Sequence, residues 1–142
     1  YADSKEQFIT EAFRLLKPGG RLVIADGFVA AFENNDDPII RQWLDGWQVN
    51  YLETPGRFES FMKQTGFTHV SYRNISKETI HSSRRLNRFY YLASLYLLWK
   101  KINFSKPATE MQKKNIRACK FQYQGMKKGL WQYGLIVGTK QG

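Results

Sequence analysis

Apolar residues recur at helical spacing between residues 8 and 16, and charged residues separate them. This pattern predicts an amphipathic helix that begins near residues 3–4. Pro18 ends the helix, because proline disfavours the helical conformation at the residue before it. Gly19 and Gly20 follow, and glycine accepts the positive φ angles that a tight exit from a helix requires. The segment therefore predicts a helix followed by a sharply turning loop.

An unbroken apolar run comes next, from Leu22 to Ala25. Such a run is typical of a strand buried on both faces of a sheet, whereas a strand with one wet face alternates. Asp26 and Gly27 are predicted to close this strand. Ligands of open α/β sheets bind at the carboxyl ends of strands, so both residues lie where a site is expected. The alternative, that Asp26 only ends the strand, stays open.

The rest of the pattern alternates helices and strands, which predicts an α/β chain whose parallel strands are joined by crossovers. Capping residues and periodicity place these elements. They are a helix capped by Asp37 with an apolar stripe from Ile39 to Trp47, a helix from Thr54 to Gly66 that turns Phe58, Phe61 and Met62 inward, a strand containing Val70 and Tyr72, a helix from Thr109 to Met126, and a strand from Leu130 to Thr139.

The stretch from Phe89 to Trp99, FYYLASLYLLW, is entirely apolar or aromatic apart from Ser94. It is too short to span a bilayer, which takes roughly 20 residues in a helix. Two interpretations stay open for it. The helix packs on the protein core, or its aromatic residues cover an apolar pocket while its basic flanks contact an anionic membrane surface.

Basic residues are concentrated in the region around this stretch. The 142-residue chain has a net charge of +10, and twelve of its basic residues lie between Arg84 and Lys128, opposed only by Glu110. The rest of the chain is therefore close to neutral. A basic surface of this kind attracts nucleic acid, anionic lipid or a negatively charged substrate, or it is simply a solvated helix surface.

Composition adds few constraints. The chain is 42% hydrophobic and 15% aromatic, which is enough for a packed core. Its single cysteine, Cys119, forms no internal disulfide, which fits a reducing, cytoplasmic location. Cys119 is expected to be a small core residue rather than a nucleophile. Neither His69 nor His81 has a partner at metal-ligand spacing, so no metal is expected.

Three stretches appear in order along the chain: YADSKEQFITEAFRLLKPGGRLVIADGF, TPGRFESFMKQTGFTHVSYRNIS and GMKKGLWQYGLIVGTK. They resemble the helix and fifth strand, the next helix and sixth strand, and the closing seventh strand of class I S-adenosylmethionine-dependent methyltransferases. The resemblance is to the small-molecule group that includes tocopherol, sterol and sugar methyltransferases. It covers most of the chain, and three segments in the right order are more specific than one.

The resemblance implies the C-terminal part of a Rossmann-like methyltransferase sheet, with strands five to seven and an antiparallel last strand between the other two. It also implies a helical insertion at about residues 77–128 that covers the acceptor. The family's glycine-rich loop and acidic residue for S-adenosylmethionine would precede Tyr1, so the cofactor-binding residues cannot be placed here. Residues 1–142 are therefore expected to be the C-terminal portion of one domain, without its N-terminal cofactor-binding half and inactive alone.

Two residues are candidates for catalysis. Methyl transfer requires alignment of the acceptor, with a base for oxygen or nitrogen acceptors, or carboxylates and aromatic faces for a cationic carbon intermediate. Asp45 lies among aromatic residues and His81 follows the predicted second strand. The alternatives are that Asp45 forms a solvated ion pair with Arg41 and that His81 is structural or exposed.

Aromatic residues are the candidates for acceptor binding, and their density indicates a fairly apolar acceptor. They are Trp43, Trp47, Tyr51, Tyr90 and Tyr123.

The functional hypothesis is S-adenosylmethionine-dependent methyl transfer to a small, fairly apolar molecule, with this chain supplying the acceptor side. The alternative is a basic module that binds nucleic acid or a membrane surface without catalysis. Neither the acceptor atom nor the oligomeric state follows from the residues.

Overall fold

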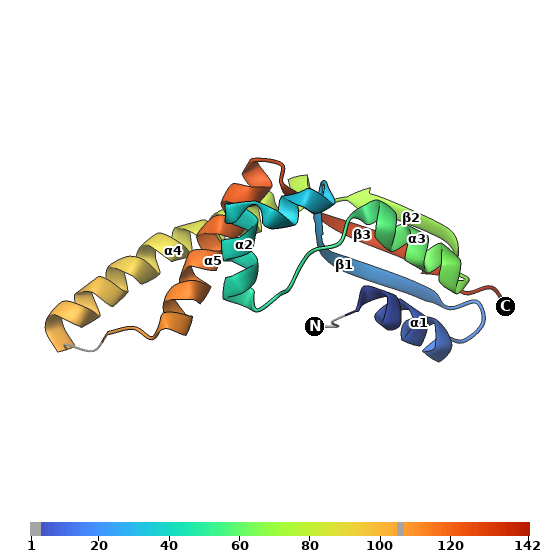
Figure 1. Cartoon of the computed structure of the whole chain (residues 1–142), viewed down its shortest axis with the longest axis horizontal. Coiled ribbons are helices and arrows are strands. Elements are labelled where there is room, and N and C mark those ends of the chain that lie inside the picture. Colours follow the sequence, from blue (N-terminus) through green and yellow to red (C-terminus); the bar gives the residue numbers. More distant parts are fainter. Residues whose placement is uncertain (1–3, 105–106) are drawn as a thin grey trace. The chain divides into compact units, whose positions relative to one another are not determined.

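The computed structural model describes residues 4–104 and 107–142 and divides the chain into two compact units (Figure 1). The first unit contains the chain up to Phe32 together with Leu52–Lys77 and Trp131–Gly142. The second contains Glu33–Tyr51 and Glu78–Leu130. Lys106, one of the basic residues counted above, lies outside the described residues.

A three-stranded sheet forms the framework of the first unit. Its strands are β1 (Arg21–Val29), β2 (Thr68–Asn74) and β3 (Trp131–Thr139), in the spatial order β1-β3-β2. The last strand in the sequence lies between the other two and runs antiparallel to both, as expected. Since β1 and β2 are each antiparallel to β3, they run parallel to one another without being hydrogen-bonded neighbours.

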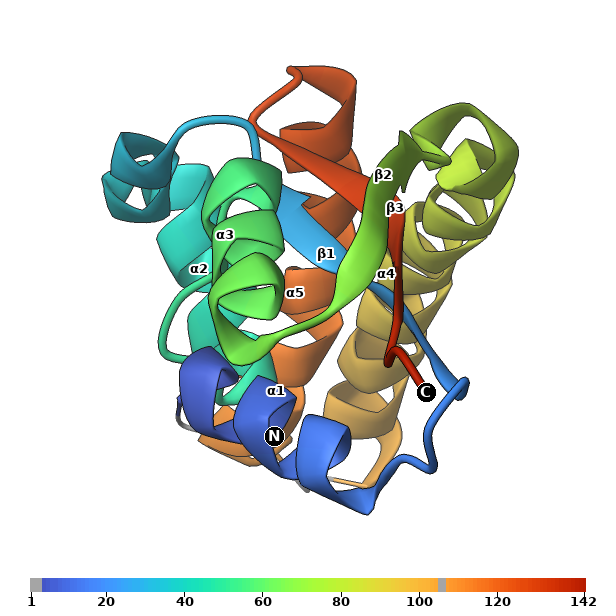
Figure 2. The ribbon, with the colours of Figure 1, turned by 90° about the vertical axis from the view of Figure 1, so that its right-hand side faces the viewer.

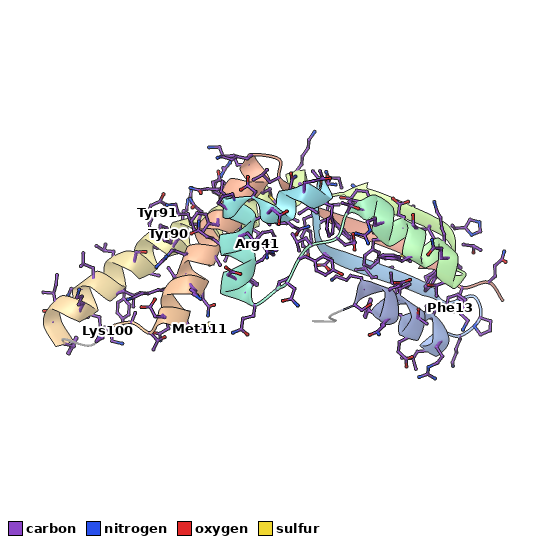
Figure 3. The ribbon with its side chains drawn as sticks, in the orientation of Figure 1. Phe13, Arg41, Tyr90, Tyr91, Lys100 and Met111 are labelled. Carbon is purple, nitrogen blue, oxygen red and sulfur yellow. The ribbon has the colours of Figure 1, made fainter. Side chains whose placement is uncertain are left out.

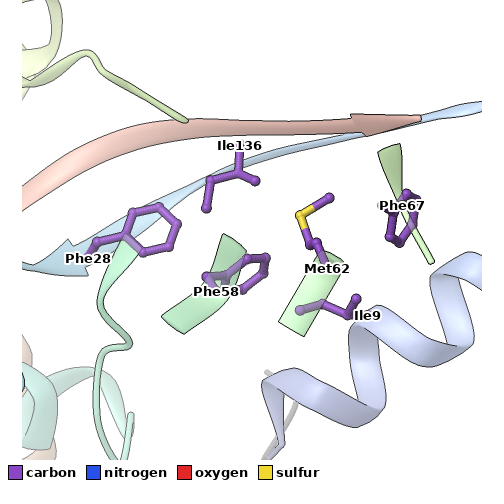
Figure 4. Close-up of a cluster of buried hydrophobic side chains, with 6 residues drawn as sticks. All are labelled: Ile9, Phe28, Phe58, Met62, Phe67 and Ile136. Carbon is purple, nitrogen blue, oxygen red and sulfur yellow. The ribbon is translucent and has the colours of Figure 1, made fainter. Parts of the chain in front are cut away.

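Two helices cover one side of this sheet. The first is α1 (Lys5–Leu15), which is capped by the Ser4 hydroxyl, and the second is α3 (Pro55–Thr65), capped by Thr54. The two helices lie beside one another on the same side of the strands (Figure 2). Their apolar sides meet the sheet in a core formed by six buried residues (Figure 4). These are Ile9, Phe28, Phe58, Met62, Phe67 and Ile136.

The prediction that β1 is buried on both faces is wrong for this structure. Exposure alternates along its first half, and the Val23 side chain is 59% exposed. The helices of this unit pack against one face of the sheet only. Alternate residues of the apolar run therefore point toward the helices and toward the open face. The strand also continues beyond Asp26 and Gly27 to Val29, because both residues keep their places in the ladder with β3.

Lys140 joins the end of the last strand to the end of the first helix. Its ammonium group donates hydrogen bonds to the carbonyl oxygens of Phe13 and Leu16, each at 2.8 Å. These are among the carbonyl groups that have no partner within the helix. The loop that follows uses Gly19 at a φ of 80°, and its amide donates to the Lys140 carbonyl at 2.7 Å. Lys140 therefore caps α1 from far along the sequence.

Gly134 lets Tyr72 lie flat across the sheet. The Tyr72 ring packs edge-on against Phe28, with 5.6 Å between ring centroids. A Cβ atom at Gly134 would overlap this ring and would lie 2.7 Å from the hydroxyl oxygen. Burial, with a smaller effect of the Glu59 carboxylate, raises the pKa of Tyr72 above its usual value. The position therefore requires glycine for space.

The second unit is helical and is built around two closely packed helices. They are α2 (Pro38–Trp47), which begins at its Asp37 cap, and α5 (Glu110–Lys127), where Thr109 and Gln112 form the reciprocal capping box. The core between them is formed by Ile40, Trp43, Leu44, Ala118, Cys119 and Met126.

A short 3-10 helix, η1 (Phe32–Asp36), precedes α2, and the long helix α4 (Ser76–Phe104) lies between β2 and α5 in the sequence. The apolar stretch from Phe89 to Trp99 is thus one segment of a 29-residue helix. The capping signals at Asp37, Thr54 and Thr109 are all confirmed.

Replacement of Gly134 by alanine is expected to lower the free energy of unfolding by about 1–3 kcal/mol, the usual cost of overpacking. Urea denaturation monitored by circular dichroism measures this change. Gly56→Ala is the matched control, because a Cβ atom at Gly56 meets nothing within 4 Å and its φ is not positive. Equal stabilities for the two variants would contradict the packing argument.

Candidate functional site

A pocket in the second unit lies between the end of α2, the middle of α4 and the first half of α5. Its cavity volume is about 520 Å³. Its walls are mostly hydrocarbon and aromatic, with two amide side chains. The lining residues are Gly46, Trp47, Gln48, Phe89, Met111, Asn115, Ile116 and Cys119.

Close approach of two helix backbones forms the base of this pocket. A Cβ atom on Gly46 would lie 2.6 Å from the Ala118 Cβ and 2.6 Å from the Lys114 carbonyl oxygen. Only glycine lets α2 and α5 come this near. Immediately afterwards Gln48 takes a left-handed conformation, with φ 56°, and ends the helix. Its side-chain amide points toward the Met111 sulfur, at 3.8 Å.

The rim of the pocket carries three large, half-exposed side chains. Trp47 is 53% exposed, Phe89 is 54% exposed and Met111 is 46% exposed. The amides of Gln48 and Asn115 are the polar groups beside them. Small-molecule pockets usually combine apolar walls with a few such polar groups. The arrangement suits a small apolar molecule that carries one carbonyl or hydroxyl group.

Cys119 lies at the inner side of the pocket. Its thiol is buried and donates a weak hydrogen bond to the Asn115 carbonyl oxygen at 3.5 Å. Burial raises the pKa of the thiol, which opposes formation of a thiolate. The structure therefore agrees with the prediction of a core cysteine rather than a nucleophile.

Trp47 is the predicted acceptor-binding residue that lines this pocket. Trp43 instead fills the core between α2 and α5 and is only 8% exposed. Tyr51 and Tyr123 are half-buried and do not belong to the pocket lining. The structure adds Phe89 to this lining, and the sequence had placed Phe89 in the apolar stretch whose aromatic residues were one candidate cover for an apolar pocket.

Tyr90, which Figure 3 labels on α4, lines a second, smaller pocket between α4 and α5. This pocket has a cavity volume of about 190 Å³ and is also lined by Ser94, Lys113 and Arg117. The Lys120 ammonium group lies over the Tyr90 ring, 5.2 Å from its centroid, in cation–π geometry. Adjacent residues of α4, Phe89 and Tyr90, therefore contribute to different pockets.

Neither candidate catalytic residue lines either of these pockets. Asp45 is exposed on α2, and its backbone carbonyl accepts a hydrogen bond from the Gln48 amide at 3.3 Å. The predicted ion pair with Arg41 is absent from the described part of the chain, because the guanidinium donates to the Asn50 carbonyl at 2.7 Å instead. His81 is exposed on α4. Their catalytic roles stay predictions.

In the first unit, Asp26 forms an ion pair with Lys5. The Lys5 Nζ lies 3.1 Å from Asp26 Oδ2, with the two side chains 10% and 27% exposed. The other carboxylate oxygen accepts a hydrogen bond from the Gly27 amide at 2.8 Å. Asp26 therefore links the start of α1 to the middle of β1, which favours a structural role over the ligand-binding role that its position suggested.

Glu53 is a buried carboxylate that the sequence did not single out. It is 2% exposed, and one oxygen lies 3.5 Å from the Arg57 Nε. Its backbone carbonyl accepts a hydrogen bond from Val29, at the carboxyl end of β1, at 3.1 Å. The Arg57 guanidinium lies over the rings of Phe32 and Phe61, at 5.1 and 5.7 Å. Glu53 directly precedes the Thr54 cap of α3, where an acidic residue is common, so the sequence held no signal that this carboxylate is buried.

Comparison with known proteins finds methyltransferases by sequence and by structure. No family model matches the chain. It is 30% identical to the ubiquinone/menaquinone biosynthesis C-methyltransferase UbiE of Bartonella tribocorum over 95 residues, which covers 50% of this chain and 35% of the relative. The chain is therefore related in sequence to a methyltransferase, and it spans about a third of the length of that relative.

Solved structures extend the similarity to almost the whole chain. A putative sarcosine dimethylglycine methyltransferase from Galdieria sulphuraria matches with a TM-score of 0.70 and 18% identity, covering 99% of this chain and 49% of that one. The chain has the methyltransferase fold. A Haemonchus contortus phosphoethanolamine N-methyltransferase 2, solved with S-adenosylhomocysteine, matches with a TM-score of 0.69 and 17% identity, covering 96% of this chain and 30% of that one.

These matches confirm the resemblance to S-adenosylmethionine-dependent methyltransferases that the sequence indicated. The structural match covers almost all of this chain, including its antiparallel last strand and the helices described above. The family resemblance rested on three stretches of sequence. The fold match agrees with it, although the identity to the solved structures is only 17–18%.

The Cys119 thiol is expected to react with iodoacetamide at pH 8 much more slowly than a free thiol, because it is buried and its raised pKa leaves less thiolate. Mass spectrometry of the time course measures the rate. The same chain unfolded in urea is the internal control and should react at the ordinary rate. Equally fast reaction of the folded chain would contradict this and show that Cys119 is accessible and that its pKa is not raised.

Proposed function

We propose that the protein transfers a methyl group from S-adenosylmethionine to a small, fairly apolar acceptor, and that this chain supplies the acceptor side. The fold match over 99% of the chain carries the proposal. The sequence relative is a C-methyltransferase of ubiquinone and menaquinone biosynthesis, which supports an apolar acceptor methylated at carbon.

The strand order supports the finer assignment within the family. A last strand that lies between two earlier ones and runs antiparallel to both matches the arrangement of strands five, seven and six. In this assignment β1 is the fifth strand, β2 the sixth and β3 the seventh. The helical region at about residues 77–128 is then the insertion that covers the acceptor.

The pocket at the end of α2 is the proposed acceptor site. The faces of Trp47 and Phe89 would contact the apolar part of the acceptor, and the amides of Gln48 and Asn115 would orient its polar group. Positioning of this kind is the main contribution that a protein makes to an in-line methyl transfer. Tyr90, in the neighbouring pocket, would contact a larger substituent of the same molecule.

The glycine pair Gly19-Gly20 does not provide a cradle for S-adenosylmethionine. Gly19 and Gly20 follow α1 instead of opening a helix, and their amides already donate to the carbonyl groups of Lys140 and Lys17. No backbone amide of this glycine pair therefore remains to hold a carboxylate or a ribose. The cofactor site is proposed to lie in sequence upstream of Tyr1.

The alternative is a basic module without catalysis, and two of its basic residues are engaged within the unit instead of being free for nucleic acid. Lys113 is paired with Glu110 at 3.1 Å, and Lys120 lies over aromatic rings. These cations are therefore engaged within the unit. Contact with a membrane surface rests on a different set of residues, on α4.

The 142-residue chain is expected to bind S-adenosylmethionine weakly or not at all in isothermal titration calorimetry. The protein made from its complete reading frame is the comparison and should bind it. Micromolar binding by the 142-residue chain alone would contradict the assignment of the cofactor site to sequence upstream of it.

Trp47→Ala and Phe89→Ala are each expected to raise the KM for an apolar acceptor by about tenfold or more, because each removes an aromatic wall of the pocket. Steady-state methyl transfer by the protein from its complete reading frame measures this change. Phe8→Ala is the matched control, since Phe8 is a half-exposed aromatic residue on α1 outside the pocket. An unchanged KM in both pocket variants would place the acceptor elsewhere.

A further inference from the structure

The second half of α4 carries a broad exposed apolar face. Ile102 is 72% exposed and Leu92 is 67% exposed, and seven further large apolar side chains of this helix are more than half exposed. At about 100° per residue, they spread over about two thirds of the helix circumference and leave one narrower side without exposed apolar residues. They are Tyr91, Leu95, Tyr96, Leu98, Trp99 and Phe104, together with Phe89, which borders the pocket described above.

The opposite side of the same helix is already occupied. Tyr90 is half-buried beneath Lys120 of α5, and Ser94 and Leu97 line the small pocket together with Ile116 of α5. The helix therefore has one side that contacts the rest of its unit and one that faces away from it. The apolar residues are therefore exposed although the helix packs against its unit on the other side.

Basic residues flank this face at both ends. Arg84, Arg85 and Arg88 are exposed on the turns before it. Lys101 and Lys100, of which Figure 3 labels the second, lie near its end. Within residues 4–104 and 107–142, none of these five cations forms an ion pair. An apolar face between unpaired cations is complementary to a surface that offers hydrocarbon next to negative charge.

Length decides how such a helix could meet a bilayer. The segment from residue 89 to residue 104 is about 24 Å long at 1.5 Å per residue, against about 30 Å of hydrocarbon. None of the helices in the described part of the chain is long and apolar enough to cross a membrane. Tyrosine and tryptophan favour the boundary between headgroups and acyl chains. These properties favour a helix that lies in the plane of the interface.

We propose that the exposed face of α4 docks onto an anionic lipid bilayer. The apolar side chains enter the boundary between headgroups and acyl chains, and the flanking arginine and lysine side chains contact lipid phosphates. Another protein surface would bury the same apolar face, but it would not account for five unpaired cations around it. The proposal goes beyond methyl transfer and does not depend on it.

The test is cosedimentation of the protein from its complete reading frame with phosphatidylcholine vesicles, with and without phosphatidylglycerol. Binding is expected only with the anionic lipid. It should weaken as the ionic strength rises from about 0.1 to 1 M, where the Debye length falls from about 10 to 3 Å. Binding that is equal for both kinds of vesicle, or absent from both, would overturn the proposal.

Two sets of variants separate the apolar and the electrostatic parts. Leu95→Glu with Ile102→Glu should abolish vesicle binding, whereas Leu15→Glu, at a 67% exposed position on α1, should leave it unchanged. Replacement of Arg84, Arg85 and Arg88 by glutamine should lower it roughly a hundredfold, from about 1 kcal/mol per basic residue near an anionic surface.

The same apolar variants also test whether protein covers the face instead. If a second copy or another part of the protein packs on it, Leu95→Glu with Ile102→Glu will dissociate an oligomer in light scattering or lower the melting temperature by several degrees. Either result would overturn the proposal. An unchanged mass and melting temperature together with lost vesicle binding would support it.

Discussion

Insertion of β3 between β1 and β2 is the interaction on which the first unit depends. The strand pairs Val29 with Trp131 and Thr68 with Thr139, so both ladders join residues that are far apart in the sequence. Its far end positions Lys140 to cap α1. Without the last strand, β1 and β2 would have no hydrogen-bonded neighbour among the described residues, and the first helix would lose its cap.

In the second unit a single close contact has a comparable effect. Gly46 brings the backbones of α2 and α5 together, and Gln48 ends α2 immediately afterwards. The aromatic ring of Trp47 is thereby held at the rim of a pocket instead of in the core. A local backbone requirement thus positions the side chain that a methyl acceptor would contact.

The helix α4 combines two kinds of surface. On one side it contributes Phe89 and Tyr90 to pockets, and on the other it presents Leu95, Ile102 and their neighbours to solvent. A methyltransferase with an apolar acceptor would benefit from both properties, because apolar molecules concentrate in membranes. The proposed acceptor pocket and the proposed lipid-binding face would then be two sides of one element.

The sequence by itself determined the elements whose signals are local. Helix starts at Asp37 and Thr109 depend on neighbouring residues, and the family resemblance added the antiparallel last strand. Tertiary structure alone decided that Val23 is exposed, that Asp26 pairs with Lys5, and that Trp47 enters a pocket while other aromatic residues do not. The physical reason is that burial and pairing depend on which distant segments cover a given face, and periodicity within one segment carries no information about them.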